Sequence, residues 1–169
     1  MIACIHVSHR QNWTNPSGSS LLVIVPMDSA KRVKSSSDAA SRRMRATRRR
    51  DTLPERLLRS ELHRRGLRYR VDYPVLPRRR ADVVFPVRQL AVFVDGCFWH
   101  GCPVHGTLAK ANAAFWKAKI SANRERDHNT DVRLAGAGWE VVRIWEHQSM
   151  SEAADFIEAI VRDRMAAHS

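Results

Sequence analysis

The stretch from Val92 to His105, VFVDGCFWHGCPVH, restricts the possible folds of this chain more than any other part of the sequence. It begins within a short apolar run, Leu90 to Val94, which is typical of a buried strand. One acid, two cysteines, two histidines and two adjacent aromatic residues then follow within eleven residues. The simplest interpretation is a buried strand that leads into a zinc-binding loop, with the aromatic pair in the core. The alternative is a functional site, in which Asp95 can hold a cation such as Mg²⁺ and His100 can act as a ligand or a general base.

Zinc is the metal that this loop favours. Cys97, Cys102 and His105 are soft ligands at close spacing. Structural zinc is bound by four ligands, so the fourth must come from elsewhere. His147, at the end of a later predicted strand, is one candidate, and His100, between the two cysteines, is the other. His100 is also a candidate general base, and His147 can instead be an ordinary surface residue.

Carboxylates indicate a second metal site. Asp82 begins one predicted strand and Asp95 ends the next, and a tight connection between antiparallel strands would bring these two ends together. Two acids there can hold Mg²⁺, which polarises a phosphate and activates water. Glu55 is a candidate third acid. Asp82 can instead be a turn residue after the preceding arginines, and Glu55 can instead cap its own helix.

Positive charge is concentrated in the first part of the chain, which has a formal net charge of +12 over 169 residues. Residues 1–50 carry ten Lys and Arg against two Asp and Glu, whereas residues 81–169 carry ten against eleven. This asymmetry predicts a polyanionic partner, and nucleic acid is favoured over an anionic membrane because the basic segments lack a large apolar face. No apolar run is long enough to predict a membrane-spanning helix. Three cysteines, two of them beside histidines, favour metal binding in a reducing compartment over disulfide bonds.

The remaining pattern predicts an α/β fold with a small mixed sheet. A capping box at Thr52 begins a helix that ends at Gly66. Strands are predicted at residues 68–76, 81–87, 89–94 and 139–147, with a turn at residues 78–80. Further helices are predicted at residues 109–135, as one helix or two, and from Ser149 onward. The apolar faces of the first and last helices are predicted to consist of Leu57, Leu58 and Leu62, and of Phe156, Ile157, Ile160, Val161 and Met165.

Several motifs, in this order and spacing, resemble the very short patch repair (Vsr) DNA mismatch endonucleases. They are RRMRATRRRDTLPE, RRRADVVF, VFVDGCFWHGC, FWKAKI and GWEVVRIWEH, and the resemblance runs from about Ser41 to His147. It implies a restriction-endonuclease-like core. It also implies an enzyme that nicks DNA 5′ to the T of T·G mismatches, which arise when 5-methylcytosine deaminates.

The resemblance also implies roles for individual residues. Asp82 would bind the catalytic Mg²⁺ together with the backbone carbonyl of Val94, and Glu55 and Asp95 would be further acids of the active site, with His100 as the catalytic histidine. It selects His147 over His100 as the fourth zinc ligand. The structural zinc would thus be held by Cys97, Cys102, His105 and His147. The residues expected to contact DNA are Phe98, Trp99 and Trp116, which would insert beside the mismatch, and Met44, Arg42, Arg43 and Arg45 of the basic N-terminal segment.

The chain departs from the family pattern at three positions. Ala81 stands where a proline often precedes the metal-binding aspartate. Asp95 stands where the best-known members have a histidine, so the surroundings of the metal can differ. His105 is displaced by one residue from a cysteine, although other members also carry the zinc on mixtures of cysteine and histidine.

We therefore expect a Vsr-like endonuclease domain at residues 41–166, with residues 41–51 as a basic arm. Residues 1–40 are expected to be disordered or the product of a start codon assigned too early, with Met27 as the true start. The expected protein is monomeric, acts on double-stranded DNA with a T·G mismatch, does not bind membranes, and lies in the cytoplasm on the nucleoid, with other mismatch-repair proteins as candidate partners. The rivals are a nuclease of the same fold without mismatch preference and a zinc-stabilised DNA-binding module without catalysis.

Overall fold

The computed structural model describes residues 6–7, 50–106 and 112–166. Apart from His6 and Val7, the predicted N-terminal extension lies outside these residues, as does nearly all of the basic arm. The predictions made for both segments therefore stay predictions. No helix among the described residues is long and apolar enough to cross a membrane.

The first described helix, α2 (Leu53–Arg64), begins and ends close to where the sequence predicts. Its C-terminus is closed by two backbone hydrogen bonds, from Gly66 N–H to His63 O at 2.9 Å and from Leu67 N–H to Leu62 O at 3.1 Å. Gly66 permits this closure because its φ is 77°, which side chains disfavour. The predicted apolar face is correct for Leu58 and Leu62, which are fully buried, but wrong for Leu57, which is 49% exposed.

A mixed sheet forms the centre of the fold, in the order β1-β5-β4-β3-β2. Strands β2, β3 and β4 pair antiparallel, whereas β4 and β5 pair in parallel, so a mixed α/β fold is confirmed. The sequence did not predict the short strand β1, which pairs antiparallel with β5. The strands are β1 (His6–Val7), β2 (Arg70–Leu76), β3 (Arg79–Phe85), β4 (Leu90–Asp95) and β5 (Glu140–Trp145).

Several strand boundaries differ from the prediction by one or two residues: β5 ends at Trp145 rather than at His147, and β3 differs at both ends. The predicted turn at residues 78–80 is too long, because Arg79 and Arg80 already belong to β3. The guanidinium of Arg79 donates a hydrogen bond to Thr130 Oγ1 of α3 at 3.2 Å, which stabilises this arginine within the strand. A run of arginines can therefore belong to a strand. Strand β3 ends at Phe85 rather than at residue 87, since residues 86–88 form a 3₁₀ turn that is closed by Gln89 in the left-handed region.

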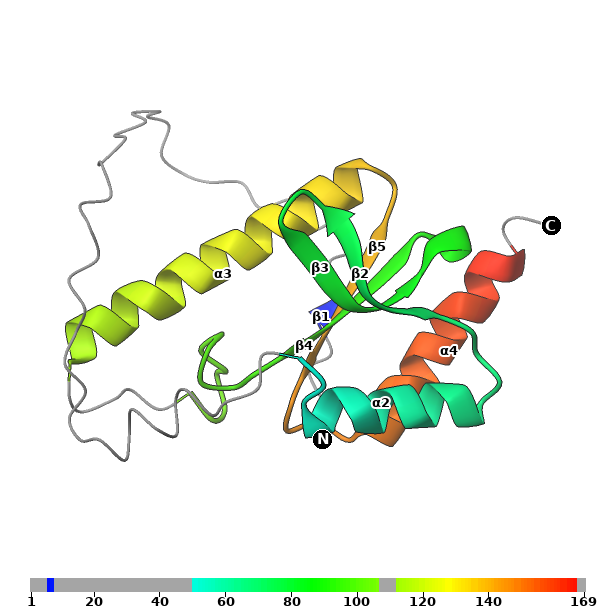
Figure 1. Ribbon diagram of the computed structural model, residues 1–169, viewed down its shortest axis with the longest axis horizontal. Coiled ribbons are helices and arrows are strands. Elements are labelled where there is room, and N and C mark those ends of the chain that lie inside the picture. The colour runs from blue at the N-terminus through cyan, green and yellow to red at the C-terminus, as the bar shows by residue number, and fades with distance from the viewer. Residues whose placement is uncertain (1–5, 8–49, 107–111, 167–169) are drawn as a thin grey trace. The chain divides into compact units, whose positions relative to one another are not determined.

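Each face of the sheet has its own apolar core, and Figure 1 shows α2 and α4 (Met150–Ala166) running side by side with α3 (Ala113–Gly136) across the opposite face. The larger core includes Leu58, Val92 and Ile157. The last helix is where the sequence predicts, and Ser149 Oγ accepts a hydrogen bond from Glu152 N–H at 3.4 Å. Met165, however, is 47% exposed and does not belong to the predicted inner face.

The long helix α3 is a single helix rather than two, and it begins after Asn112, whose φ is 58°. Only three of its described residues are buried: Asn123, Thr130 and Leu134. Two of these are polar, so α3 is not held mainly by apolar packing. Most side chains of α3 are exposed, and the helix contacts the loop that follows β4 through polar residues such as Asn123.

Candidate active site

Two carboxylates, Asp82 and Asp95, lie near each other on neighbouring strands. Asp95 is the last residue of β4, whereas Asp82 is the middle residue of β3 rather than its first as predicted, because β3 already begins at Arg79. The antiparallel pairing of these strands brings them together, as the sequence predicts. Asp82 is fixed to β4, since its Oδ2 accepts a hydrogen bond from Val94 N–H at 2.7 Å. Glu55, in the first turn of α2, is close enough for its charge to act on Asp82. The three predicted acids are therefore brought together.

Burial raises the pKa of Asp82 from 3.8 to about 6, because the ionised carboxylate loses its hydration. The hydrogen bond from Val94 opposes this rise, whereas the negative charges of Glu55 and Asp95 add to it. Asp82 forms no ion pair within the described part of the chain. A partly buried carboxylate without a cationic partner, facing further carboxylates, is an arrangement that a divalent cation would stabilise.

Glu55 also holds the start of its own helix. Its Oε2 accepts a hydrogen bond from Asp51 N–H at 2.9 Å, and its Oε1 accepts one from the Thr52 hydroxyl at 2.8 Å. The predicted capping box is therefore present only in part, because Glu55 reaches back to the start of α2 but the Thr52 side chain makes no capping hydrogen bond to the helix backbone. An ionised carboxylate has about four lone-pair positions, so two such bonds do not exclude a further contact with a cation.

His100 follows β4 on the cysteine-containing loop and lies beside Asp127 of α3. Its Nδ1 is 2.5 Å from Asp127 Oδ2 and 3.6 Å from Asp95 Oδ1. Burial lowers the pKa of His100, but the hydrogen bond to Asp127 and the charges of both carboxylates outweigh burial, so the pKa lies above its ordinary value. Because Nδ1 faces Asp127, Nε2 is the ring nitrogen available to a substrate.

Arg143, in the middle of β5, connects the carboxylates on this side of the sheet. It donates to both oxygens of Asp95, at 2.9 and 3.0 Å, and to both oxygens of Asp131 on α3, at 2.9 to 3.1 Å. It also donates to the backbone oxygen of Asp127 at 3.4 Å and lies over the ring of Phe93, 4.6 Å from its centroid. Arg143 therefore links the end of β4 to the helix that positions His100.

The sequence reasoning missed Asp127, Asp131 and Arg143. Both aspartates lie in a helix that carries many charges of both signs, where each resembles a solvated residue. Arg143 did offer a signal, because it interrupts the apolar run of β5, and a charged residue inside a buried strand requires partners.

Four potential soft-metal ligands meet beside this site: Cys97, Cys102, His105 and His147. Their ligand atoms all lie within 4.8 Å of one another. His147 Nδ1 is 3.0 Å from the Cys97 sulfur and 3.7 Å from the Cys102 sulfur. His100 is not part of this group. The structure thus brings together the four residues that the sequence singled out.

The geometry of this cysteine–histidine cluster fits a tetrahedral zinc ion. Zinc bonds of about 2.0–2.3 Å place neighbouring ligand atoms roughly 3.3–3.8 Å apart. The 3.7 Å between His147 Nδ1 and the Cys102 sulfur lies in this range, and the 3.0 Å to the Cys97 sulfur is slightly below it. Both cysteines are free and buried, so no disulfide competes for the sulfurs. Burial and the neighbouring Cys102 raise the pKa of Cys97 to about 12 in the metal-free protein. A bound zinc would take the place of that proton.

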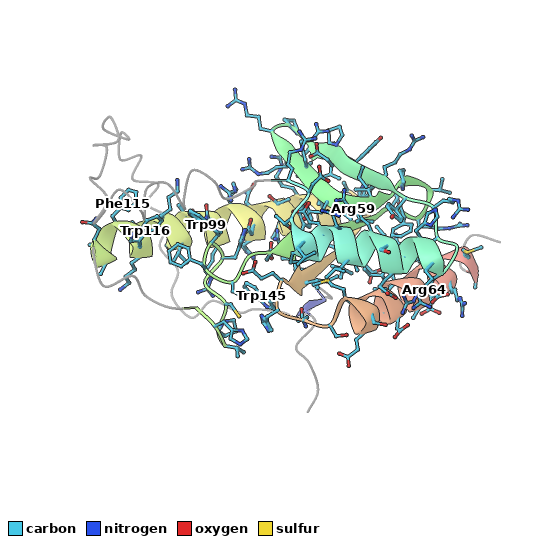
Figure 2. All side chains as sticks on the ribbon, turned by 60° about the horizontal axis from the view of Figure 1, so that its bottom comes forward. Arg59, Arg64, Trp99, Phe115, Trp116 and Trp145 are labelled. Atoms are coloured by element: carbon cyan, nitrogen blue, oxygen red, sulfur yellow. The ribbon has the colours of Figure 1, made fainter. Side chains whose placement is uncertain are left out.

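Four aromatic residues gather at the N-terminal end of α3, and Figure 2 shows Trp99, Phe115 and Trp116 together there. Phe98 completes the group, with ring centroids 5.3 Å from Trp99 and 5.2 Å from Trp116. The Asn123 side chain donates to the backbone oxygen of Trp99 at 2.8 Å, which ties the loop to α3. The three predicted aromatic residues are thus brought together, and Phe115, 40% exposed, joins them.

The remaining predicted DNA contacts lie outside the described residues. These residues are Met44, Arg42, Arg43 and Arg45 of the basic N-terminal segment. Their proposed roles stay predictions.

Comparison with known proteins identifies similar sequences. The family model described as "DNA mismatch endonuclease Vsr" matches residues 33–105. The type II nicking enzyme V.NaeI of Lentzea aerocolonigenes is 44% identical over 117 residues, which are 67% of this chain and 70% of that protein. The DNA mismatch endonuclease Vsr of Escherichia coli strain K12 is 41% identical over 109 residues, which are 63% of this chain and 68% of that protein.

Proposed function

Because the chain belongs to the Vsr family of DNA mismatch endonucleases and is therefore a DNA endonuclease, we propose that it nicks DNA 5′ to the T of a T·G mismatch. Such mismatches arise when 5-methylcytosine deaminates, and the nick would begin very short patch repair. One observation carries this proposal. Trp99, whose indole suits insertion into a base stack, directly precedes His100, whose imidazole suits proton transfer.

The acids around Asp82 would hold the catalytic metal. Asp82 and the backbone carbonyl of Val94 would be ligands of Mg²⁺, and Glu55 would lie close to it. When bound there, Mg²⁺ neutralises charge on the phosphate and lowers the barrier to hydrolysis. The raised pKa of Asp82 supports this assignment, because an ion bound to its carboxylate would offset the unfavourable burial of its charge.

His100 would transfer protons through its Nε2. Asp127 holds Nδ1 at 2.5 Å, which fixes the orientation of the ring and favours the protonated form. A protonated imidazole can donate its Nε2 proton to the oxygen that leaves the phosphorus atom. Asp127 would therefore act as a positioning residue for His100.

Mismatch preference would come from the aromatic residues. Unstacking a base pair costs a few kcal/mol, and it costs least at a mismatch. Stacking of a base on an aromatic side chain returns about 1–3 kcal/mol. Phe98, Trp99 and Trp116 would therefore open a T·G pair more readily than a matched pair. This preference distinguishes the proposed enzyme from a general nuclease.

The cysteine–histidine cluster would hold a structural zinc. Cys97 and Cys102 lie on the loop that carries Trp99 and His100, whereas His147 lies just beyond β5. A zinc ion would therefore join the active-site loop to the sheet. We also propose that the sheet and its flanking helices form a restriction-endonuclease-like core, since Asp82 and Val94 lie on paired neighbouring strands of the sheet.

The test uses a labelled duplex with a single T·G pair, a matched duplex of the same sequence, and Mg²⁺. We expect a nick 5′ to the T, only in the mismatched duplex and only with Mg²⁺. Asp82→Asn should abolish nicking and retain mismatch binding. The control Asp163→Asn, at an exposed acid of α4, should behave as wild type.

Three results would contradict the proposal. Equal cleavage of the matched duplex would indicate a nuclease without mismatch preference. Full activity of Asp82→Asn would place the active site elsewhere, and mismatch binding without any cleavage would indicate a DNA-binding module.

A further inference from the structure

A groove runs between α3 and the loop that carries His100, and His100 itself does not line it. One wall is formed by Gly101, Cys102 and Gly106, and the other by the face of α3 that carries Lys117 and Arg124. Its volume is about 780 Å³. The groove begins directly beside the aromatic cluster, because Lys117 follows Trp116 along the helix.

The base of the groove is a close contact between loop and helix. Gly101 has a φ of 64°, and a Cβ atom at this position would lie 2.8 Å from Ile120 Cγ2. The loop backbone therefore approaches α3 as closely as only glycine allows. This contact sets the distance between the two walls, so the groove is part of the packed structure.

The charges in the groove favour an anion. Lys117 and Arg124 are exposed and form no ion pair with any described residue. Arg65 and Arg143, in contrast, are each bound by several carboxylates. His128 adds a further basic group, and Glu125 is the only acid among the groove-lining residues within the described part of the chain. The groove therefore offers two cations without an ion-pair partner among the described residues, beside the aromatic cluster.

We propose that this groove binds the phosphate backbone of the DNA strand next to the aromatic cluster, with Lys117 and Arg124 each neutralising one phosphate. The proposal rests on the proposed function, because it takes the DNA of that function as its ligand. Contacts to phosphate position a duplex without reading its sequence, whereas the aromatic residues act on the bases. The groove should therefore contribute affinity that is equal for mismatched and matched DNA.

The test measures the affinity for labelled T·G and matched duplexes by fluorescence anisotropy, without Mg²⁺ and between 50 and 200 mM salt. Each phosphate contact contributes about 0.9 to the slope of log affinity against log salt. The double variant Lys117→Ala, Arg124→Ala should make that slope shallower by about 2 for both duplexes. The ratio of the two affinities should not change.

Two controls isolate the groove. The double variant Arg126→Ala, Arg133→Ala removes the same charge from the same helix at the same spacing of seven residues, about half a turn around from the groove. Its salt slope should stay near that of wild type. The charge-conserving variant Lys117→Arg, Arg124→Lys should also retain the wild-type slope. All of these residues are exposed, so the variants should unfold at the wild-type temperature.

Three results would overturn the groove proposal. One is an unchanged slope in the Lys117→Ala, Arg124→Ala variant. Another is an equal loss in both alanine pairs, which would indicate general attraction to a basic helix. The third is a loss of T·G preference at an unchanged slope. Failure of wild type to prefer or nick a T·G duplex would instead overturn the proposed function, because the slope is measured on matched DNA as well.

Discussion

Asp82→Asn should stabilise the protein in the absence of Mg²⁺, even though it removes the proposed Mg²⁺ ligand. The ionised Asp82 carboxylate is unfavourable in the fold, because it is largely removed from water and faces the charges of Glu55 and Asp95. Asparagine carries no charge, and its side-chain oxygen can still accept the hydrogen bond from Val94 N–H, which Asp82 accepts at 2.7 Å. The substitution therefore removes the unfavourable charge and keeps the contact.

The magnitude follows from the pKa of Asp82, which rises from 3.8 to about 6 on folding. Since each pKa unit corresponds to about 1.4 kcal/mol, the ionised carboxylate destabilises the fold by about 3 kcal/mol. Below pH 4 both the folded and the unfolded states hold the proton, so the effect is absent. It grows as pH rises from 4 to 6, where only the unfolded state has lost the proton, and it is complete above pH 7.

The assay is thermal unfolding of wild type, Asp82→Asn and the control Asp163→Asn, in buffer without Mg²⁺ and without chelator, so that the proposed zinc would be retained. At pH 8 the Asp82→Asn variant should unfold roughly 6–12 °C above wild type, at about 2–4 °C per kcal/mol for a chain of this size. This difference should vanish near pH 4. Added Mg²⁺ should raise the unfolding temperature of wild type and of the Asp163→Asn control, but not that of Asp82→Asn. If Asp82→Asn were no more stable than wild type at pH 8, the burial argument would be refuted.

Four further substitutions test other parts of the site. Cys97→Ala should give a misfolded protein without stoichiometric zinc, measured by metal analysis and circular dichroism, because structural zinc contributes directly to folding. Arg143→Met should lower the free energy of unfolding by about 3–5 kcal/mol in denaturant titrations, because it leaves buried carboxylates without a counterion. Trp99→Ala should lower the ratio of T·G to matched cleavage with nicking retained. Asp127→Asn should move the fall of activity at high pH to lower pH, since it removes a hydrogen bond that raises the pKa of His100.

The closeness of the cysteines to His105, and that of Asp82 to Asp95, could be predicted because local spacing determines both. Cys97, Cys102 and His105 lie on one short loop, so any fold of that loop leaves them close. Asp82 and Asp95 meet because a tight connection joins two adjacent strands. In both cases the short loop limits how far apart the residues can be.

The contacts of α3 could not be predicted in the same way. Most of its residues are exposed, so no apolar face indicates which side packs against the sheet. Asp127 meets His100 only because the loop after β4 lies against this helix, at the contact between Gly101 and Ile120. That contact depends on a glycine with positive φ, which hydrophobic patterns do not indicate.

The distribution of charge supports the proposal that Mg²⁺ binds at Asp82 rather than at Asp95. Both oxygens of Asp95 accept hydrogen bonds from Arg143, and His100 lies on the same side of the sheet. A cation at Asp95 would have to displace a guanidinium that is buried and held by several carboxylates. Asp82 and Glu55 have no such partner in the described part of the chain. If Mg²⁺ binds at Asp82 as proposed, Arg143 would be the cation at Asp95, and Asp95 would contribute by holding Arg143 in place rather than by binding metal.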